Sequence, residues 1–580
     1  MWGGLGGTPK LRRSLSLWRI SGNSWRKKSR VRVEGISDVT PPPTALILAA
    51  GPGKRFWPYN VVRQKAAFPI ANLPLIRRLV DDLAGLGIER IVVVVGPGEG
   101  SVRAALRGAA GDIRFVRQPH PTGTADAALH AAAGVDGDLL VLHGDSATAP
   151  ANIAALLARF AEERPPAAAL IQPLGDETSH DWLVAFPEGG RLAGVEGHGR
   201  DGRHRLCGVY ALAADAVPYL RDNPGLMSRV PVGGMPPLEA EIAQSLQGMI
   251  DEKQPVLAVE TVGYHLDVDK PWHILQANRQ VINRLSLALE GNRIHPTAKV
   301  HDGAEIHGRL VLGENAVIGN RVVAMGDLWL GAGASITNGA ILEGPLVVGD
   351  ETAIRHYCQI GGHSTLGARG VYSHGAEFSG VALETVYCYH YCEIAGVVGQ
   401  AVDFGAATVC GNLRFDDRET VWRVLGRAEV PSAGANLAYF GDFSRTGVNA
   451  IIMPGRRTGV YSVVGPGVIL YDDLPDRTLI TAEQTCVPAP GDQNSTAGNA
   501  SCQLALLHPS RGKTDPFLPR VDRKALSAQK TDECHAELLR HVHRQVAGRG
   551  DGADNRHARH RRFLQNLVGS PPAHQQQTIR

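Results

Sequence analysis

The chain has 580 residues and carries 60 lysine and arginine residues against 57 aspartate and glutamate residues, a formal net charge of +3. One hydrophobic core rarely serves so long a chain, so we expect two or more domains. The near-neutral balance gives no reason to expect nucleic acid or an anionic membrane as the main partner.

The cysteines and the apolar runs indicate in which cellular compartment the protein is expected. The eight cysteines include no C-x-x-C pair, and the closest two are Cys388 and Cys392, so neither a zinc ribbon nor a disulfide framework is predicted. Reduced thiols in a cytoplasmic protein are the expectation. No apolar run approaches the roughly 20 residues that a membrane-spanning helix needs, so we expect a soluble protein with no membrane partner.

Residues 1–43 form a basic extension, and its first 34 residues are rich in arginine and serine with Glu34 as their only acid. Organelle-targeting peptides share this composition. The alternative is a disordered extension or a misplaced start codon, and we expect no packed structure in this segment.

Residues 44–286 alternate short β-branched runs with helical ones, beginning with "ALILAAG", "PLIRRLVDDLAGLG" and "RIVVVVG". This is the βαβ signature of a parallel sheet covered on both faces, a Rossmann-like α/β domain. Ligands of such sheets lie outside the carboxyl ends of the strands. The loop after "ALILAA" and the loop after "LLVLHG" should therefore face the same crevice.

Beyond residue 290 the periodicity changes, and aliphatic residues recur at every sixth position from Ile294 to Leu366, with Ala324 as the exception. Glycine follows many of them, where a tight turn needs a residue without a side chain. This hexapeptide repeat predicts a parallel β-helix with three short strands per coil over residues 287–485. The phase slips by two within 378–386, and a non-repeating insertion occupies 412–439, where a binding site could be built.

The repeat stops after about residue 485. Residues 486–580 contain the basic, His-rich tract "HVHRQVAGRGDGADNRHARHRRF" ahead of a Gln-rich end. We predict a disordered tail, which could contact anions or simply be solvated.

The stretch "ILAAGPGKRFWPYNVVRQKAAFPI" places a glycine-rich turn directly after a buried strand. Such a turn exposes several backbone N–H groups in one concavity, which attracts phosphate oxygens. Gly51 and Gly53 let the backbone approach a ligand, while Arg55 and Lys65 add the positive charge that a polyphosphate requires. A glycine-rich loop with basic residues is by itself a weak signal.

The wider pattern is more specific: L-A-A-G-x-G-x-R, a lysine with P-[VI], then Q…G-T in "RQPHPTGTADAALH", G-D in "VLHGD" and "GYHLDVDKPWHILQANRQVI". In these five motifs the N-terminal half resembles the sugar-1-phosphate nucleotidylyltransferase family. The resemblance implies metal aspartates at Asp145 and Asp267 and sugar-phosphate contacts at Glu196 and Gly208. It implies nucleotide contacts at Leu48, Ala49, Ala50, Gly51, Gly53, Gln118, Gly123 and Thr124.

The reaction implied is in-line attack of a sugar-1-phosphate oxygen on the α-phosphorus of a nucleoside triphosphate, UTP or dTTP, with release of pyrophosphate. Mg²⁺ on Asp145 and Asp267 would bridge substrate phosphates, since this ion keeps few protein ligands. Arg55 would bind the leaving pyrophosphate, and Lys65 the phosphates at the reaction centre. Two solvated aspartates on loops are the plainer interpretation of Asp145 and Asp267.

The sequence departs from the family pattern mainly on the sugar side. His265 replaces a tryptophan, Gln64 replaces the proline before the lysine, and Asp181 stands at the sugar-facing glycine. The segment "VEGHG" keeps Glu196 but lacks a lysine, and Leu206, Cys207 and Gly208 replace N-T-G or N-A-G. The nucleotide half of the site is therefore predicted to be intact and the sugar half altered.

The succession of a nucleotidylyltransferase and a left-handed β-helix resembles the bifunctional uridylyltransferase and acetyltransferase family of the archaeal type, most specifically in "VDFGAATVCGNLRFDD". This resemblance implies an acetyl-CoA-dependent site with His390 as general base. Because β-helices of this repeat type usually pack about a threefold axis, we also expect a homotrimer. Asn412 would hold the substrate and Arg355 the sugar phosphate. A packed coil histidine is the alternative for His390.

Three departures predict that acetyl transfer is weak or lost: Glu393 stands where the family has tyrosine, Ser379 where it has lysine, and one residue is deleted after His390. For the whole chain the alternative to an enzyme is a non-catalytic or regulatory nucleotide-sugar-binding subunit of a paired pyrophosphorylase. Intact Arg55, Lys65 and the two aspartates favour the enzyme.

Overall fold

The computed structural model describes residues 43–484 except 176, 178, 180, 181, 198–200 and 231–237. The predicted basic extension and His-rich tail lie outside these residues, as does Asp181. The elements below belong to Met1–Ala482, one of the two units into which the chain divides.

The N-terminal part is built on a nine-stranded sheet in the order β5-β4-β1-β6-β11-β8-β12-β10-β9. Its parallel half consists of β1 (Thr44–Ala49), β4 (Arg90–Val95), β5 (Asp112–Arg117) and β6 (Leu139–His143). Alternate residues of β1 enter two different hydrophobic clusters, because successive side chains of a strand point to opposite faces. The apolar run "ALILA" is therefore buried on both sides, as predicted.

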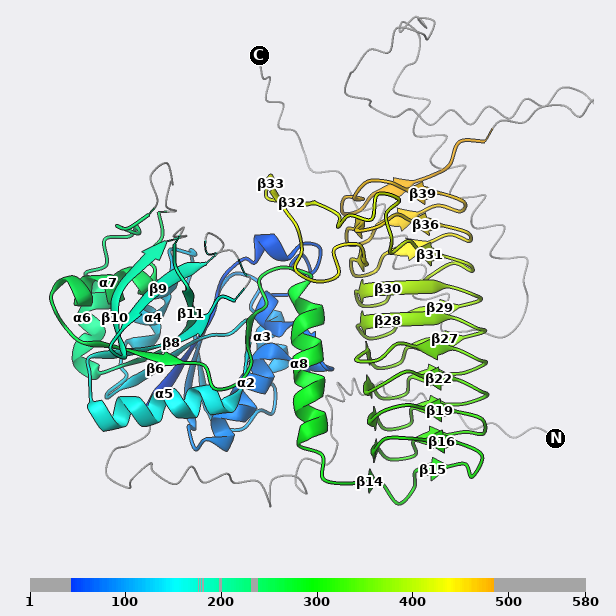
Figure 1. The fold of residues 1–580 in the computed structure, drawn as a ribbon, viewed down its shortest axis with the longest axis horizontal. Helices are drawn as coiled ribbons and strands as arrows, with labels where there is room; N and C mark the ends of the chain where they lie inside the picture. Colours follow the sequence, from blue (N-terminus) through cyan, green and yellow to red (C-terminus); the bar gives the residue numbers. More distant parts are fainter. Residues whose placement is uncertain are drawn as a thin grey trace, which may run out of the picture. The chain divides into compact units, whose positions relative to one another are not determined.

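Helices cover both faces of this sheet (Figure 1). One cluster packs α4, α6 and α7 against the sheet, and the other packs α2, α3 and α5 against it. The helices are α2 (Leu75–Gly85), α3 (Gly100–Ala105), α4 (Thr124–Ala132), α5 (Pro150–Glu163), α6 (Val217–Arg221), α7 (Ile242–Asp251) and α8 (His273–Leu287).

The second half of the sheet is mixed and shapes the crevice. Strand β11 (His204–Leu212) runs antiparallel to both β6 and β8 (Ala167–Pro173), β12 (Val256–Glu260) is parallel to β8, and β9 (Leu183–Glu188) pairs antiparallel with β10 (Arg191–Gly197). A separate pair, β7 (Ser146–Thr148) and β13 (His265–Asp267), aligns Asp267 with Ser146. This register brings Asp267 beside the residue that follows Asp145.

From residue 293 the chain forms stacked coils of short parallel strands, and the predicted parallel β-helix is confirmed (Figure 1). Strand residues pair with residues eighteen positions on, as Leu310 with Leu328 and Leu328 with Leu346. The first face holds β14 (Arg293–Ile294), β17 (Leu310–Leu312), β20 (Leu328–Leu330), β23 (Leu346–Val348), β26 (Thr365–Leu366), β34 (Ala438–Phe440) and β37 (Arg457–Thr458).

The other two faces also consist of short parallel strands, most of them paired eighteen positions apart. The second holds β15 (Lys299–Val300), β18 (Val317–Ile318), β21 (Ser335–Ile336), β24 (Ala353–Ile354), β27 (Val371–Ser373), β29 (Tyr387–Tyr389), β35 (Arg445–Thr446), β38 (Val463–Val464) and β40 (Leu479–Ile480). The third holds β16 (Glu305–Ile306), β19 (Val323–Ala324), β22 (Ile341–Leu342), β25 (Gln359–Ile360), β31 (Val409–Cys410), β36 (Ile451–Ile452) and β39 (Ile469–Leu470).

The predicted phase slip takes place in two steps. Strands β28 (Glu377–Ala382) and β30 (Glu393–Val398) each run across a corner and join the third face to the first. Cys388 of β29 and Ile394 of β30 are the strand residues whose side chains enter the core here. The repeat predicted Val386 and Cys392 at these positions; both are also buried in the core, but each lies just before its strand. Two coils are therefore shortened, and the single slip predicted within 378–386 was only half of the change.

Glycine is required where these two long strands cross the corner. Gly380 and Gly396 have φ of 127° and 143°, a region that residues with side chains rarely adopt. A Cβ atom on Gly396 would lie 1.8 Å from the backbone oxygen of Ala438. The close stacking of the shortened coils depends on the missing side chain.

Helix α8 packs against the first face of the β-helix. Val311, Trp329 and Val347, the middle residues of three successive strands, are buried in one cluster with Ile274 and Val281 of α8. Asn278 of the same helix is buried and donates from Nδ2 to the backbone oxygen of His363 at 2.8 Å. The α/β part and the β-helix therefore share a hydrophobic core.

The insertion at 412–439 contains a hairpin of β32 (Trp422–Val424) and β33 (Arg427–Glu429). Its two turn residues, Leu425 and Gly426, have φ of 49° and 87°. Positive φ at both central residues is the mark of a type I′ turn, which matches the twist of a two-stranded ribbon.

In the part of the chain that the structure describes, no helix combines the length and hydropathy needed to cross a membrane. The five cysteines of that part, Cys207, Cys358, Cys388, Cys392 and Cys410, are buried and free.

Candidate active site

The glycine-rich loop begins where β1 ends. Leu48, Ala49 and Ala50 are buried, while Gly51 is exposed and has no atom within 4 Å of the place where a Cβ would stand. Gly53 adopts a left-handed conformation with φ of 59° just before the short helix at Lys54–Phe56. The loop thus leaves its backbone open to a ligand at Gly51, in keeping with the predicted phosphate contact.

The predicted charged residues meet at this loop. Lys65 Nζ lies 2.6 Å from Asp145 Oδ2 and 3.2 Å from Asp269 Oδ1, and Arg55 Nε lies 3.0 Å from Asp269 Oδ2. Asp145 follows β6, and Asp267 ends β13 beside it. The structure therefore brings Arg55, Lys65, Asp145 and Asp267 together and adds Asp269, which the sequence reasoning missed although it stands in the same D-V-D motif.

The charged groups of this cluster change one another's pKa values. Burial opposes the charge on Lys65, but Asp145 and Asp269 outweigh it and raise the pKa of Lys65 above its usual value. Burial alone would raise the pKa of Asp145 and Asp269, yet the Lys65 ammonium holds both below the usual range. For Asp267, burial prevails over Lys65 and the pKa is raised.

Several buried polar atoms at the crevice have no hydrogen-bond partner among the described residues. They are Asp267 Oδ1, His143 Nε2, Ser146 Oγ and both ring nitrogens of His265. Burial lowers the pKa of His265 to about 3, so its ring is neutral at pH 7. Orphaned buried polar atoms carry a desolvation cost, which a bound ligand or water would relieve.

These carboxylates fit Mg²⁺. Among the described residues no group of three or more His, Cys, Asp or Glu has the arrangement of a metal cage. Mg²⁺ does not require one, because it usually takes one or two carboxylates and completes its shell with water and substrate phosphates. Asp145 and the unpartnered oxygen of Asp267 supply such a pair.

The residues expected near the nucleotide base also lie together. Gln118 is buried and donates from Nε2 to Asp126 Oδ2 at 2.7 Å and to the Gly123 backbone oxygen at 3.3 Å. Thr124 Oγ1 donates to Glu241 Oε2 at 2.6 Å and accepts from the Ile242 amide at 2.9 Å, at the start of α7. The Thr124 hydroxyl is thus engaged in the fold, which leaves its backbone for a nucleotide contact.

The two residues expected on the sugar side lie on β10 and β11, two strands that both pair with β9. Gly208 has φ of 64° in β11, and a Cβ there would lie 2.4 Å from the ring of His143, so glycine admits that ring into the crevice. Glu196 of β10 pairs in register with Val184 of β9, which is itself opposite Arg205 of β11. Sequence reasoning had not singled out His143 or Arg205.

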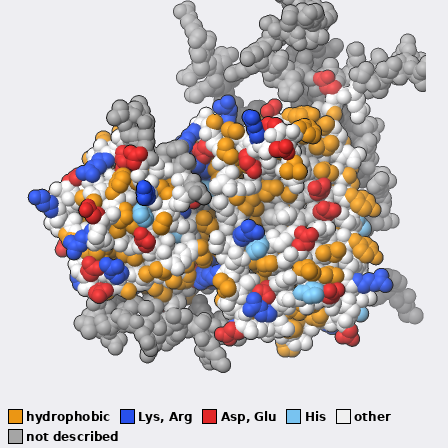
Figure 2. Space-filling view, in the orientation of Figure 1, with side chains coloured by type: hydrophobic (Ala, Val, Ile, Leu, Met, Phe, Trp, Pro, Cys, Tyr) orange, Lys and Arg blue, Asp and Glu red, His pale blue; other side chains and the backbone are white. Residues whose placement is uncertain are grey.

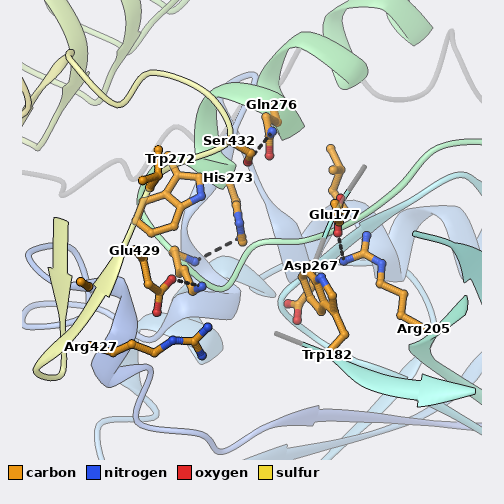
Figure 3. Close-up of a pocket in the computed structure, with 14 residues that line it drawn as sticks. Glu177, Trp182, Arg205, Asp267, Trp272, His273, Gln276, Arg427, Glu429 and Ser432 are labelled. Carbon is orange, nitrogen blue, oxygen red and sulfur yellow. Dashed lines mark hydrogen bonds and ion pairs between the residues drawn. The ribbon is translucent and has the colours of Figure 1, made fainter. Parts of the chain in front are cut away.

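A cavity of about 340 Å³ opens beside Asp267 (Figure 3). Arg205 is buried in its wall, with Nη2 donating to Gln172 Oε1 at 2.8 Å, Nη1 3.5 Å from Glu177 Oε2 and the guanidinium 3.9 Å from the centre of the Trp182 ring. Ligand pockets of this size are common in proteins. The cavity beside Asp267 therefore has a polar lining.

The residues expected to form an acetyltransferase site lie on exposed corners of the β-helix. His390 stacks on His374 with ring centres 4.5 Å apart, and His374 stacks on His356 at 4.9 Å. Burial and the neighbouring imidazoles lower the pKa of His374, and Arg355 contributes to this shift. Arg355 and His390 thus belong to one neighbourhood, and Asn412 begins the insertion after β31.

Comparisons with known proteins agree with this architecture. The family model of the MobA-like NTP transferase domain matches residues 45–294. The chain is a distant homologue of archaeal bifunctional nucleotidyltransferases. These matches confirm the resemblance of the N-terminal part to sugar-1-phosphate nucleotidyltransferases.

Three relatives show how similar known proteins are to this chain and how much of it they cover. The bifunctional protein GlmU of Methanococcus maripaludis is 27% identical, covering 75% of this chain and 96% of the relative. The bifunctional sugar-1-phosphate nucleotidylyltransferase/acetyltransferase of Sulfurisphaera tokodaii is 27% identical, over 74% and 98%. The glucose-1-phosphate thymidylyltransferase of Streptomyces antibioticus is 29% identical, over 50% and 79%.

The pairing of Lys65 with buried carboxylates predicts a pH-dependent stability. Removing a partner from a buried ion pair costs about 3 to 5 kcal/mol, so Lys65→Met should lower the free energy of unfolding by that order at pH 7. Asp145 and Asp269 have depressed pKa values in the folded wild type, so their stabilisation is present above the unfolded value of about 3.9. Without Lys65 these carboxylates repel one another in the folded protein. Protonation at lower pH removes their charge and with it this repulsion.

The loss in Lys65→Met should therefore shrink as the pH falls from 7 toward 4, which denaturant unfolding at several pH values can measure. Lys299→Met, at an exposed β-helix position, is the matched control. A difference between Lys65→Met and wild type that stays constant over this pH range would contradict the electrostatic explanation.

Proposed function

We propose that the chain catalyses Mg²⁺-dependent transfer of a nucleotidyl group from a nucleoside triphosphate to a sugar-1-phosphate, with release of pyrophosphate. The observation that carries this proposal is the cluster of Lys65, Arg55, Asp145 and Asp269 at the end of the glycine-rich loop, with Asp267 beside it. The relatives' activities support the same reaction class.

The chain's own groups act by positioning and by neutralising charge. The open backbone at Gly51 accepts phosphate oxygens, and Arg55, half exposed, is able to leave Asp269 for the β- and γ-phosphates. Lys65 is held at the reaction centre by Asp145 and Asp269, and its raised pKa keeps it charged there. No covalent nucleophile is required.

Asp145 and Asp267 would hold the Mg²⁺ ion. When bound, Mg²⁺ supplies charge neutralisation and orientation of the substrate phosphates. The three aspartates have separate functions in this scheme, since Asp269 positions the two cations whereas Asp145 and Asp267 face the metal.

An enzyme is favoured over a non-catalytic or regulatory subunit because a binding subunit does not need this arrangement. Lys65 is only 12% exposed and is shared between two carboxylates, a costly arrangement for nucleotide binding alone. UTP and dTTP are the proposed donors. We propose the nucleotidyltransferase domain at residues 44–286 and the β-helix domain at 287–485.

Asp145→Ala and Lys65→Ala should each lower kcat about a hundredfold or more, because each removes a charge at the reaction centre. The measurement is pyrophosphate release by the purified chain with Mg²⁺, each nucleoside triphosphate and a panel of sugar-1-phosphates. Asp136→Ala, an exposed aspartate in the loop before β6, is the matched control and should turn over normally. Near-normal turnover in both site variants would refute the assignment.

In the β-helix we propose that acetyl transfer from acetyl-CoA is weak or lost. Ser379 cannot supply the cation of a lysine, and Glu393 pairs directly with Glu377 in the parallel ladder, which gathers negative charge where a sugar phosphate would bind. The stacked His374 and His390 leave a base in place. Ser379 and Glu393 therefore weaken the binding of the substrate and not the base.

Wild-type chain with acetyl-CoA and glucosamine-1-phosphate should release free thiol far more slowly than the enzyme median of about 10 per second. His390→Ala and, as control, His301→Ala should both leave this low rate unchanged. A rate near the median that His390→Ala abolishes would show that the β-helix site is an active acetyltransferase.

We also propose a homotrimer. The β-helix leaves large apolar side chains exposed, among them Ile341, Ile451, Ile469, Leu413 and Phe415, and Figure 2 shows hydrophobic side chains at several places on its visible face. Phe415 is fully exposed in the segment that follows Asn412. Exposed apolar side chains in such numbers favour contact with other copies of the chain. A closed cyclic trimer buries the same side chains in every copy.

Multi-angle light scattering at micromolar concentration should give three times the mass of one chain. Phe415→Glu should shift the mass toward one chain by placing a charge in the contact, whereas Leu287→Glu, at an exposed leucine of α8, should not. A wild-type mass of a single chain would contradict the trimer.

A further inference from the structure

The hairpin β32–β33 belongs to the β-helix by sequence but reaches the nucleotidyltransferase site. Arg427, Glu429 and Ser432 line the same cavity as Arg205 and Asp267 (Figure 3). In that view Arg427 and Glu429 come from the hairpin at the left and Arg205 and Trp182 from the opposite wall. One cavity thus joins a candidate metal carboxylate to side chains some 160 residues further along the chain.

The base of the hairpin is held rigidly. Trp422 is buried and meets Trp272 edge to face at 5.1 Å, and its Nε1 donates to the Ala435 backbone oxygen at 3.0 Å. Arg457 covers the other side of the Trp422 ring at 4.7 Å and donates to the Arg423 backbone oxygen at 3.2 Å. These contacts fix the position of the hairpin relative to the start of α8, where Trp272 stands.

The second strand contacts the loop that carries the site aspartates. Glu429 forms an ion pair with Lys270, and both side chains are only 10% exposed. Lys270 follows Asp269 directly and lies three residues after Asp267. Gln276 of α8 adds a hydrogen bond to Ser432 Oγ at 3.1 Å. The hairpin therefore closes the side of the crevice on which Asp267 lies.

The cavity lining is charged but balanced. Among the residues that the structure describes, its carboxylates are Glu177, Asp267 and Glu429, and its cations are Arg205, Lys270 and Arg427. His273 adds a ring whose pKa burial lowers to about 3, so it is uncharged at pH 7. Arg205 lies beside Glu177 and Lys270 pairs with Glu429, so these charges are matched within the lining. Such a lining suits a ligand with many hydroxyl groups, which donate to carboxylates and accept from guanidinium and ammonium groups. A carboxylate on the ligand would compete with Glu177 and Glu429 for Arg205 and Lys270.

We propose that the hairpin β32–β33 completes the sugar-binding end of the nucleotidyltransferase site, with Arg427 as a specificity-determining residue for the ring of an uncharged hexose 1-phosphate. This inference rests on the proposed nucleotidyl transfer. It explains why the sugar half of the N-terminal motif departs from the family pattern: part of that half is supplied from the insertion at 412–439.

The test measures KM for the sugar-1-phosphate and for the nucleoside triphosphate separately, by pyrophosphate release from the full chain. Arg427→Ala should raise KM for the sugar-1-phosphate about tenfold or more, as loss of a charged hydrogen bond does, and leave KM for the triphosphate within about twofold. Arg427→Lys should recover part of the loss, because it restores the charge without the planar fork.

Arg423→Ala is the matched control, since Arg423 is an exposed arginine of the paired strand and is not part of the cavity wall. The wild type should prefer a neutral hexose 1-phosphate to a hexuronic acid 1-phosphate by about tenfold in kcat/KM. Unchanged KM values in Arg427→Ala, or a preference for the acidic sugar, would overturn this inference and leave the nucleotidyltransferase intact. A wild type inactive with every pair of substrates would instead remove the proposed function, and this inference with it.

Discussion

The hydrophobic core that α8 shares with the first face of the β-helix is the contact on which the rest of the arrangement depends. A coil of three strands buries only its inward side chains, so the outward Val311, Trp329 and Val347 would face water if α8 did not cover them. Their eighteen-residue spacing forms a straight apolar stripe, and a helix is long enough to lie along it. Both ends of α8 thereby become fixed, including Trp272 beside the site.

That fixed end connects the fold to the chemistry. The chain leaves Asp267 and Asp269 and enters α8 within a few residues, so the helix that docks on the β-helix also determines where these carboxylates lie. Trp272, Lys270 and the hairpin then form one continuous set of contacts. In this chain the second domain is therefore a structural part of the crevice, in addition to any site or subunit contact of its own.

The sequence allowed the fold class and most of the charged cluster to be predicted, because both rest on local patterns. The strand that ends at Ala49 and the repeat from Ile294 have clear periodicities, and Lys65, Asp145 and Asp267 stand in recognisable motifs. Asp269, Arg205 and Arg427 were missed because each acquires its place from a contact distant in sequence: Asp269 from Lys65, Arg205 from Trp182, and Arg427 from a hairpin inside an insertion. The phase slip was placed but not resolved, since buried Val386 and Cys392 resemble strand residues when burial is judged from hydropathy alone.

The length of each coil limits where residues can be inserted into or deleted from the β-helix. Most residues of the β-helix pair with a neighbour eighteen positions on, but Tyr372 pairs with Cys388, Phe378 with Ile394 and Val463 with Leu479, sixteen positions on. A shift of one residue within a strand would turn its inward side chains outward, whereas extra residues at a corner, as at 412–439, leave the strand pattern unchanged. Length differences between related chains are therefore expected as whole coils or as insertions at corners, and to be absent at Gly380 and Gly396, where the backbones of neighbouring coils already touch.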